Sequence, residues 1–298
     1  MTLELLPRHP RPARVFALPF AALACFRNRQ GESTGKGTEV KVSSARADQF
    51  STGVVARLRT QLMTRFVRPC LAILHKDLTI ELRTREIVTT AGFFAALVAI
   101  LASFSFYSGP STTTRIAPGA IWLSVAFSSV LALGRTWQRE RDEGALTGLL
   151  VAPIARSAIF LGKALGVFAF ITAVECIVVP IVALLFHVEL PDVIGPLALI
   201  LLLGTLGVAA TGTLFGAMTV RTRARDLVLA TVLFPLLSPN LVSGVAATRI
   251  IFGASESMGG TSAAAQIAEV RDYIVLLSMF DAVAILGGIA LFGALVDD

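Results

Sequence analysis

The chain of 298 residues is poor in charged side chains and in the patterns that catalysis requires. Only 15% of its residues are charged, and Cys25, Cys70 and Cys176 form neither a CxxC pair nor the spacing of a metal site. No nucleophile triad or acid–base pair is evident, which argues against an enzyme. No Gly-x-x-x-x-Gly-Lys-Ser/Thr loop occurs, so any nucleotide has to be bound by another chain. The three cysteines imply no disulfide framework.

Long apolar runs dominate what remains. Hydrophobic residues make up 55% of the chain, and the mean hydropathy is +0.76. A helix needs about 20 apolar residues to cross the hydrocarbon core of a bilayer, and six runs reach roughly that length. The sequence therefore predicts an all-α, polytopic membrane protein with six transmembrane helices. The predicted spans are Ile87–Tyr107, Ile116–Leu133, Ile159–Phe186, Val193–Val220, Leu227–Phe252 and Tyr273–Val296.

Basic residues alternate between the loops and predict the orientation of the chain. The segments on one side are rich in arginine, whereas those on the other hold Arg115 and Arg271, with Arg249 near a span end. The positive-inside rule then places both termini in the cytoplasm. The net charge of +6 arises beside membrane segments, which suits contact with lipid headgroups and not with nucleic acid. The basic side comprises Arg83, Arg85, Arg135, Arg139, Arg141 and Arg156, and then Arg221, Arg223 and Arg225.

Residues 1–69 differ in composition from the rest, with scattered Arg, Pro, Gly and Ser and no sustained periodicity. We expect this N-terminal extension to be either a disordered cytoplasmic tail or the result of a start codon assigned too early, with Met63 as the initiator. Residues 70–298 are predicted to form the six-helix domain. Its first segment, Cys70–Glu86, is amphipathic, which fits a helix in the headgroup plane or the end of an ordinary juxtamembrane helix.

The loop at 135–157 carries the most informative soluble pattern. Leucines at helical spacing predict a short amphipathic helix that Pro153 limits, and carboxylates lie near its expected start, where the helix dipole favours them. A short helix tied to two spans suits mechanical contact with a soluble partner. The alternative is a loop that packs only on its own bundle. The candidate coupling residues are Arg139, Glu140, Asp142, Gly144, Leu146, Leu149 and Pro153.

Two carboxylates, Glu175 and Asp281, lie within the apolar runs. Because an ionised carboxylate facing lipid is costly, both are expected to face the protein interior or water, or to be protonated. They fit a substrate pathway or gating site. The alternative is a polar contact that fixes helix packing, with Thr172, Thr205, Thr211 or Thr213 as possible partners. The sequence leaves this choice open.

Prolines and one histidine mark the remaining irregular positions. Pro235 and Pro239, four residues apart, are predicted to break the fifth span and to leave its outer half as a re-entrant or surface helix. Pro180 predicts a milder break in the third span. His187, at a span end, suits an interfacial residue better than a ligand of haem iron.

Several motifs follow one another in order over the membrane domain. They carry a family resemblance together, because an ordered series is far more specific than any one of its members. The motifs are His75–Leu78 with Glu81–Glu86, Ala117–Gly119 with Trp122, Arg139 through Gly144–Leu146 to Pro153, Gly162–Lys163, Gly204–Gly207 with Met218, Val220–Arg225, Phe234–Leu237 and Phe280–Asp281.

On these motifs the chain from about Cys70 to its end resembles the haem exporter B family, the CcmB-type membrane subunit of the cytochrome c maturation ABC complex. It departs from the family pattern at Thr147, where members often carry a charged residue, and in the extension before about Met63. The resemblance implies an ABC-2 or type V exporter-like permease of half size.

The resemblance also implies the partners and the cargo. ATP is expected on a separate ATPase subunit, and the further partners are haem-handling C and D subunits, a periplasmic haem chaperone and a second copy of this chain. Haem is the expected transported or handled ligand, with no covalently bound cofactor. The location is the bacterial inner membrane, with several passes.

Two alternatives stay open. One is a permease of the same architecture for another substrate, such as a lipid or a drug. The other is an ion-coupled secondary transporter that uses Glu175 or Asp281. The second is disfavoured because no repeat is evident between the two halves of the membrane region.

Overall fold

The computed structural model describes residues 66–105, 110–188, 190–219, 225–256 and 263–297. The chain divides into two compact units, Met1–Arg57 and Leu58–Asp298, and every described residue belongs to the second. The predicted extension at 1–69 therefore lies outside the described residues, apart from its last four. Arg221 and Arg223 also lie outside them.

The described residues form helices joined by short connections, and six of these helices are long and apolar enough to cross a membrane. This confirms the predicted all-α class and the six spans. The helices are α3 (Arg68–Thr84), α4 (Glu86–Ser105), α5 (Pro110–Asp142), α6 (Ala145–Val151), α7 (Arg156–Phe186), α8 (Leu190–Thr219), α9 (Arg225–Glu256) and α10 (Ala263–Asp297).

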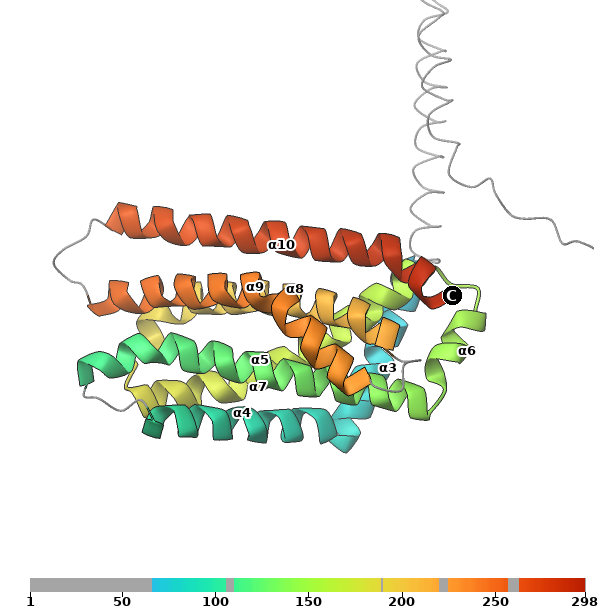
Figure 1. Cartoon of the computed structure of the whole chain (residues 1–298), viewed down its shortest axis with the longest axis horizontal. Coiled ribbons are helices and arrows are strands. Elements are labelled where there is room, and N and C mark those ends of the chain that lie inside the picture. Colours follow the sequence, from blue (N-terminus) through green and yellow to red (C-terminus); the bar gives the residue numbers. More distant parts are fainter. Residues whose placement is uncertain (1–65, 106–109, 189, 220–224, 257–262, 298) are drawn as a thin grey trace, which may run out of the picture. The chain divides into compact units, whose positions relative to one another are not determined.

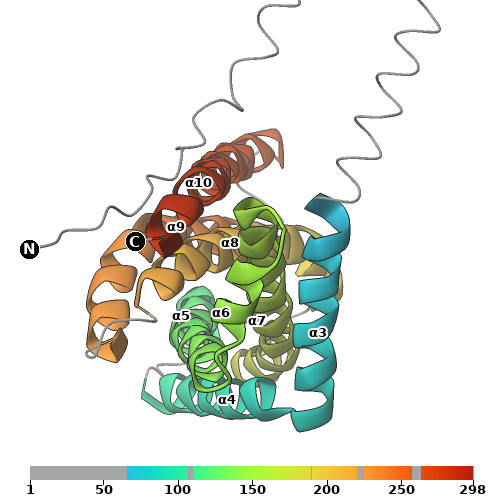
Figure 2. The same cartoon turned by 90° about the vertical axis from the view of Figure 1, so that its right-hand side faces the viewer.

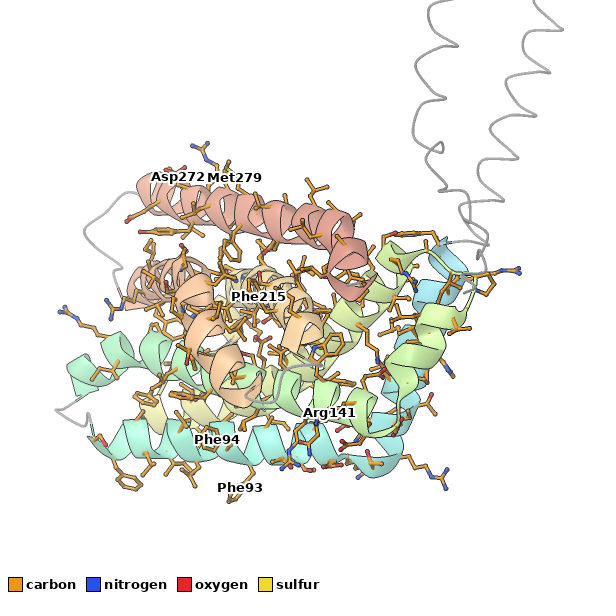
Figure 3. The ribbon with its side chains drawn as sticks, turned by 45° about the vertical axis from the view of Figure 1, so that its right-hand side comes forward. Phe93, Phe94, Arg141, Phe215, Asp272 and Met279 are labelled. Carbon is orange, nitrogen blue, oxygen red and sulfur yellow. The ribbon has the colours of Figure 1, made fainter. Side chains whose placement is uncertain are left out.

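The six long helices lie alongside one another, and the short helices α3 and α6 lie together at one end of this bundle (Figures 1 and 2). Helix α4 packs on α5 and α7, whereas α8 packs on α9 and α10. The membrane span of α5 is the most buried of the six and that of α10 the least. Phe93 on α4 and Met279 on α10 project away from the bundle, as expected of side chains that face lipid (Figure 3).

The second span ends later than predicted. Three carboxylates therefore belong to this span and the turn after it, and not to the next helix. Helix α5 continues from the expected end at Leu133 to Asp142, because Leu133 and Trp137 remain buried against neighbouring helices. Glu140 and Asp142 therefore lie at the end of α5, and Glu143 in the turn that follows it. Their predicted place in the first turn of the next helix is wrong.

Gly144 makes the chain reverse between α5 and α6. Its φ of 63° lies in the left-handed region, which glycine adopts without the steric cost that a Cβ atom brings. Helix α6 then begins at Ala145 and ends at Val151, two residues before Pro153. The predicted short helix is thus present, although it begins later than the carboxylates.

The prolines bend the fifth long helix without breaking it. Pro235 and Pro239 both lie inside α9, which changes direction in Figure 1 but continues as a helix. Pro239 has no N–H for the carbonyl of Pro235, and the Ser238 hydroxyl donates to that carbonyl at 2.7 Å instead. The predicted break is wrong, and no separate re-entrant helix appears among residues 225–256. Pro180 likewise lies inside the continuous helix α7.

Candidate functional site

Helix α3 runs across the end of the bundle and packs closely on α7 (Figure 2). Its buried face consists of Cys70, Ile73, Asp77 and Glu81, which follow helical spacing. Gly162 of α7 permits this approach, because a Cβ atom there would lie 2.9 Å from the Cys70 carbonyl oxygen and from the Ile73 Cβ. Two carboxylates are thereby buried against the bundle. Of the leucines on the same helix, Leu71 and Leu82 are exposed, whereas Leu78 packs against the hydrophobic core.

Lys163 of α7 pairs with one of these carboxylates, that of Asp77. Its side chain is 1% exposed, and its ammonium group donates to Asp77 Oδ2 of α3 at 2.7 Å. The same group forms a short hydrogen bond with Glu140 Oε1 at the end of α5. One buried cation thus joins three helices that are far apart in the sequence. A buried charge is tolerated only when it is paired in this way.

Lys76 supplies the second cation. Its Nζ lies 3.0 Å from Glu140 Oε1 and 3.3 Å from Asp77 Oδ1. Burial alone lowers the pKa of Lys76, but its hydrogen bonds and charge interactions with Glu140 and Asp77 outweigh burial and raise this pKa above its usual value. Lys76, Asp77, Glu140 and Lys163, here called the α3–α5–α7 ion network, therefore hold two positive and two negative charges. The two ammonium groups also offset the unfavourable position of Glu140 at the carboxyl end of a helix.

A second set of ion pairs connects α5 to the turn between α3 and α4. Arg139 lies 3.3 Å from Glu86 and 3.7 Å from Glu81, and Arg135 lies 3.4 Å from Glu86. Glu81 Oε1 also accepts a hydrogen bond from the Val88 backbone N–H at 2.9 Å, in the first turn of α4. Glu81 therefore occupies an N-terminal cap position for α4 although it belongs to α3.

Helix α6 combines contact with the bundle and exposure to solvent. Leu149, Leu150 and Ile154 pack against the hydrophobic core, whereas Val151 is 83% exposed. The Arg156 guanidinium donates to the Leu150 carbonyl oxygen at 2.8 Å and so ties α6 to the first turn of α7. Helix α6 is therefore held against the bundle on one side and exposed on the other.

The predicted coupling residues are divided by this arrangement. Arg139 and Glu140 lie in ion networks, and Gly144, Leu149 and Pro153 shape and hold α6. Asp142 lines a shallow cavity of about 240 Å³ together with Glu86 and both arginines of α5 named above. The side chain of Leu146 and that of Arg225 lie outside the described part of the structure. Reasoning from the sequence missed Lys76, Asp77, Glu81 and Lys163 as parts of a site, although a lysine inside an apolar run was a usable signal.

The two carboxylates inside the spans are both buried, each 4% exposed. Glu175 of α7 accepts a short hydrogen bond from the Thr205 hydroxyl of α8. Asp281 of α10 has no hydrogen-bond partner for either oxygen among the described residues. It lies against Gly207 of α8 and beside Asn240 of α9, whose amide donates to the Gly204 carbonyl oxygen at 2.8 Å. In the sequence the two carboxylates look alike, because both lie within apolar runs. The structure shows that their surroundings differ.

Other candidate sites are simpler. His187 forms the left-handed C-terminal cap of α7 with φ 54°, and its side chain is exposed. Among the described residues no group of three or more His, Cys, Asp or Glu side chains is arranged to hold a metal ion.

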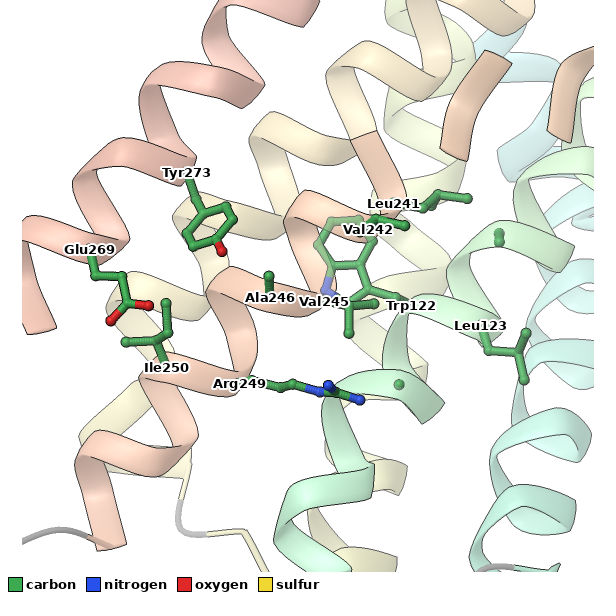
Figure 4. A pocket seen from close by; sticks show the side chains of 12 residues that line it. Trp122, Leu123, Leu241, Val242, Val245, Ala246, Arg249, Ile250, Glu269 and Tyr273 are labelled. Atoms are coloured by element: carbon green, nitrogen blue, oxygen red, sulfur yellow. The ribbon is translucent and has the colours of Figure 1, made fainter. Parts of the chain in front are cut away.

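A cavity of about 470 Å³ lies between α5, α9 and α10, with Trp122 in its wall (Figure 4).

Comparison with known proteins places these features in a family context. The family model described as CcmB protein matches residues 68–288, which is more than half of the chain. "Heme exporter protein B" of Paracoccus denitrificans is 31% identical over 179 residues, covering 60% of this chain and 81% of that one. The protein of the same name from Bradyrhizobium diazoefficiens is 26% identical over 188 residues, covering 63% and 84%. That of Rhodobacter capsulatus is 29% identical over 178 residues, covering 60% and 81%.

Proposed function

Because this chain belongs to the CcmB protein family, we propose that it is the permease subunit of an ATP-driven transporter that exports or delivers haem for cytochrome c biogenesis. The family match over residues 68–288 carries the proposal, and it confirms the resemblance seen in the sequence motifs. Relatives named "Heme exporter protein B" support haem as the handled ligand. The chain is then a non-catalytic membrane subunit, and ATP is hydrolysed on a partner.

The arrangement of α6 suggests how the partner acts on the bundle. An ATPase subunit docks on α6 around the exposed Val151 and pushes it when nucleotide is hydrolysed. The motion reaches α5 through Gly144 and α7 through Pro153, because α6 is joined to both by short connections. It reaches α3 through the α3–α5–α7 ion network, since Lys163 holds Asp77 and Glu140 at once. Coupling through Arg139, Glu140, Asp142, Gly144, Leu146, Leu149 and Pro153 is part of this proposal.

The remaining expectations complete the assembly. The transporter contains this chain as a homodimer, with an ATPase subunit, haem-handling C and D subunits and a periplasmic haem chaperone. It lies in the bacterial inner membrane with both termini in the cytoplasm, which is the side of the arginine-rich loops with Arg221, Arg223 and Arg225. Six spans are about half of the number that such transporters assemble, which supports the dimer.

A deletion strain complemented with variants tests the proposal. Staining for covalent haem should show no c-type cytochromes in the deletion strain and normal amounts after complementation with the wild type. Val151→Asp should give near-deletion levels, and its pull-down in mild detergent should lose the ATPase, because a charge replaces the exposed apolar contact. Leu71→Asp is the matched control, since it places the same charge on another exposed apolar side chain at the same end of the bundle, outside α6. Normal cytochromes in the deletion strain would contradict haem as the cargo.

One observation favours a second function. Asp281 is buried without a hydrogen-bond partner in the described structure, which is the condition expected of a group that binds a proton or an ion during transport. An ion-coupled transporter should work without ATP and follow a proton gradient. Loss of transport in Glu175→Gln or Asp281→Asn, with activity that survives ATP depletion, would favour it over the ABC permease.

A further inference from the structure

The cavity between α5, α9 and α10 lies at the opposite end of the bundle from α3 and α6. Figure 4 shows Tyr273 and Glu269 of α10 on one side of α9, and Trp122 of α5 with the Arg249 side chain on the other. Its volume of about 470 Å³ lies within the usual range of ligand pockets, roughly 300–1,000 Å³. Nothing in the proposed coupling at α6 uses it.

The charged and apolar parts of the cavity lie at different depths in the membrane. On α9, Arg249 lies four residues from the span end at Gly253, or about 6 Å, while Leu241 lies about 12 Å deeper. On α10, Glu269 is the second residue of the span. Both charges therefore lie at the level of the headgroups, and the apolar lining reaches toward the middle of a hydrocarbon core of about 30 Å.

The two charged side chains are exposed and lack partners. Neither Arg249 nor Glu269 forms a hydrogen bond or ion pair with another described residue. They line one cavity yet do not pair with each other, so each remains able to bind a charge of the opposite sign. A ligand that satisfies both carries a negative and a positive group at the same end.

The cavity is also open toward the membrane. Val242 is 66% exposed and Leu123 is 44% exposed, and both lie on the cavity wall at the depth of the hydrocarbon core. A molecule already in the bilayer reaches such a cavity without passing through water. A water-soluble ligand would instead leave these side chains without an apolar partner.

We propose that this cavity binds a phospholipid whose headgroup contains both a phosphate and a cationic amine. The phosphate binds Arg249, and the amine binds Glu269. One acyl chain packs on the apolar wall that includes Leu123 and Val242, while the other remains in the bilayer. The charge pattern and its depth match this amphiphile, and the proposal does not depend on haem export.

Lipid retention by the purified full-length chain tests the proposal. The chain is delipidated in mild detergent and titrated with phosphatidylethanolamine or phosphatidylglycerol, and bound lipid is measured by native mass spectrometry. The wild type should prefer phosphatidylethanolamine. Arg249→Gln should weaken binding of both lipids about tenfold, because a hydrogen bond to a charged group is lost. Glu269→Gln should remove the preference while binding of phosphatidylglycerol is kept.

Two matched controls make the result specific. Arg271→Gln removes the same charge from the same end of α10, outside the cavity, and should leave lipid binding unchanged. Ala246→Phe should abolish binding by filling the acyl-chain part, whereas Ala290→Phe adds equal bulk on the outer face of α10 and should not. Equal losses in Arg249→Gln and Arg271→Gln, or displacement of the lipid by soluble haem, would overturn the proposal. The measurement needs neither ATPase nor haem transport, so its failure leaves the proposed function untouched.

Discussion

Lys163 and Asp281 are both almost fully buried, but their surroundings differ. Lys163 donates to Asp77 and Glu140, and Lys76 adds a second cation to the same network. Asp281 lies beside Asn240 and Gly207 with no hydrogen-bond partner for its carboxyl oxygens among the described residues. One region thus balances its buried charges, and the other leaves a buried group without compensation.

The two regions show that buried polar groups have two different effects in one helix bundle. A balanced network holds helices in one arrangement, because removing any member leaves another charge buried and unpaired. An uncompensated carboxyl stabilises nothing where it stands, so its presence points to another state or another ligand. The first region fits the coupling proposed above, and the second fits the proposed ion-coupled alternative.

Removing Lys163 should give the largest effect. Lys163→Met leaves Asp77 and Glu140 buried with only the partly exposed Lys76 as a counter-charge, which should cost about 3–5 kcal/mol of stability. The measurement is thermal unfolding of the purified chain in detergent. Arg271→Gln is the control and should change stability little, since its pair with Asp272 is exposed. A loss below about 1 kcal/mol in Lys163→Met would show that the network does not hold the three helices together.

Adding a methyl group in the other region should have an intermediate effect. A Cβ atom at position 207 would press on the Asp281 carboxylate and the Asn240 amide, so Gly207→Ala should cost about 1–3 kcal/mol. Gly287→Ala is the control, because nothing lies within 4 Å of a Cβ atom there. It should be neutral or slightly stabilising, since alanine favours a helix. Equal stability of the two variants would mean that the patch around Asp281 is loosely packed.

Replacing Asp281 itself sharpens the contrast with the ion network. Asp281→Asn removes no ion pair, so stability should stay the same or rise by up to about 1 kcal/mol, as the cost of burying a carboxyl group falls. Glu140→Gln, by comparison, should destabilise, because it removes the negative charge that pairs with Lys76 and Lys163. Denaturation of both variants under the same conditions gives the answer. A large loss in Asp281→Asn would reveal a partner that binds the charged carboxyl.

The six long helices were predictable because each apolar run exceeds what a soluble domain requires. Their ends were harder to predict: α5 continues past Leu133 because Trp137 is buried, and hydropathy alone does not report that contact. The effect of Pro235 and Pro239 on the helix was overestimated, because the Ser238 hydroxyl replaces the N–H donor that Pro239 lacks. That compensation depends on side-chain geometry and not on composition.

The ion network was not predicted, because its members are distant in the sequence. Lys163 is 86 residues from Asp77 and 23 from Glu140, and Lys76 is 64 residues from Glu140. Periodicity assigns residues to faces of one helix but does not say which faces meet. Asp77 and Glu81, at helical spacing in the amphipathic segment, and a lysine within the third span were the available signals. Together they indicate that a partner exists without identifying it.

The exposed ion pair of Arg135 and Glu86 should contribute least to stability among the groups compared here. Both side chains are about half exposed and their charged atoms lie 3.4 Å apart, so solvent screens the attraction. Arg135→Gln should therefore cost about 0.5 kcal/mol or less, and added salt should remove the difference from the wild type. Thermal unfolding at low and high ionic strength measures both effects, with Lys163→Met beside it. The loss in Lys163→Met should persist in salt because its partners are buried. If salt abolished both losses equally, the distinction between a buried network and a surface pair at this end of the bundle would not hold.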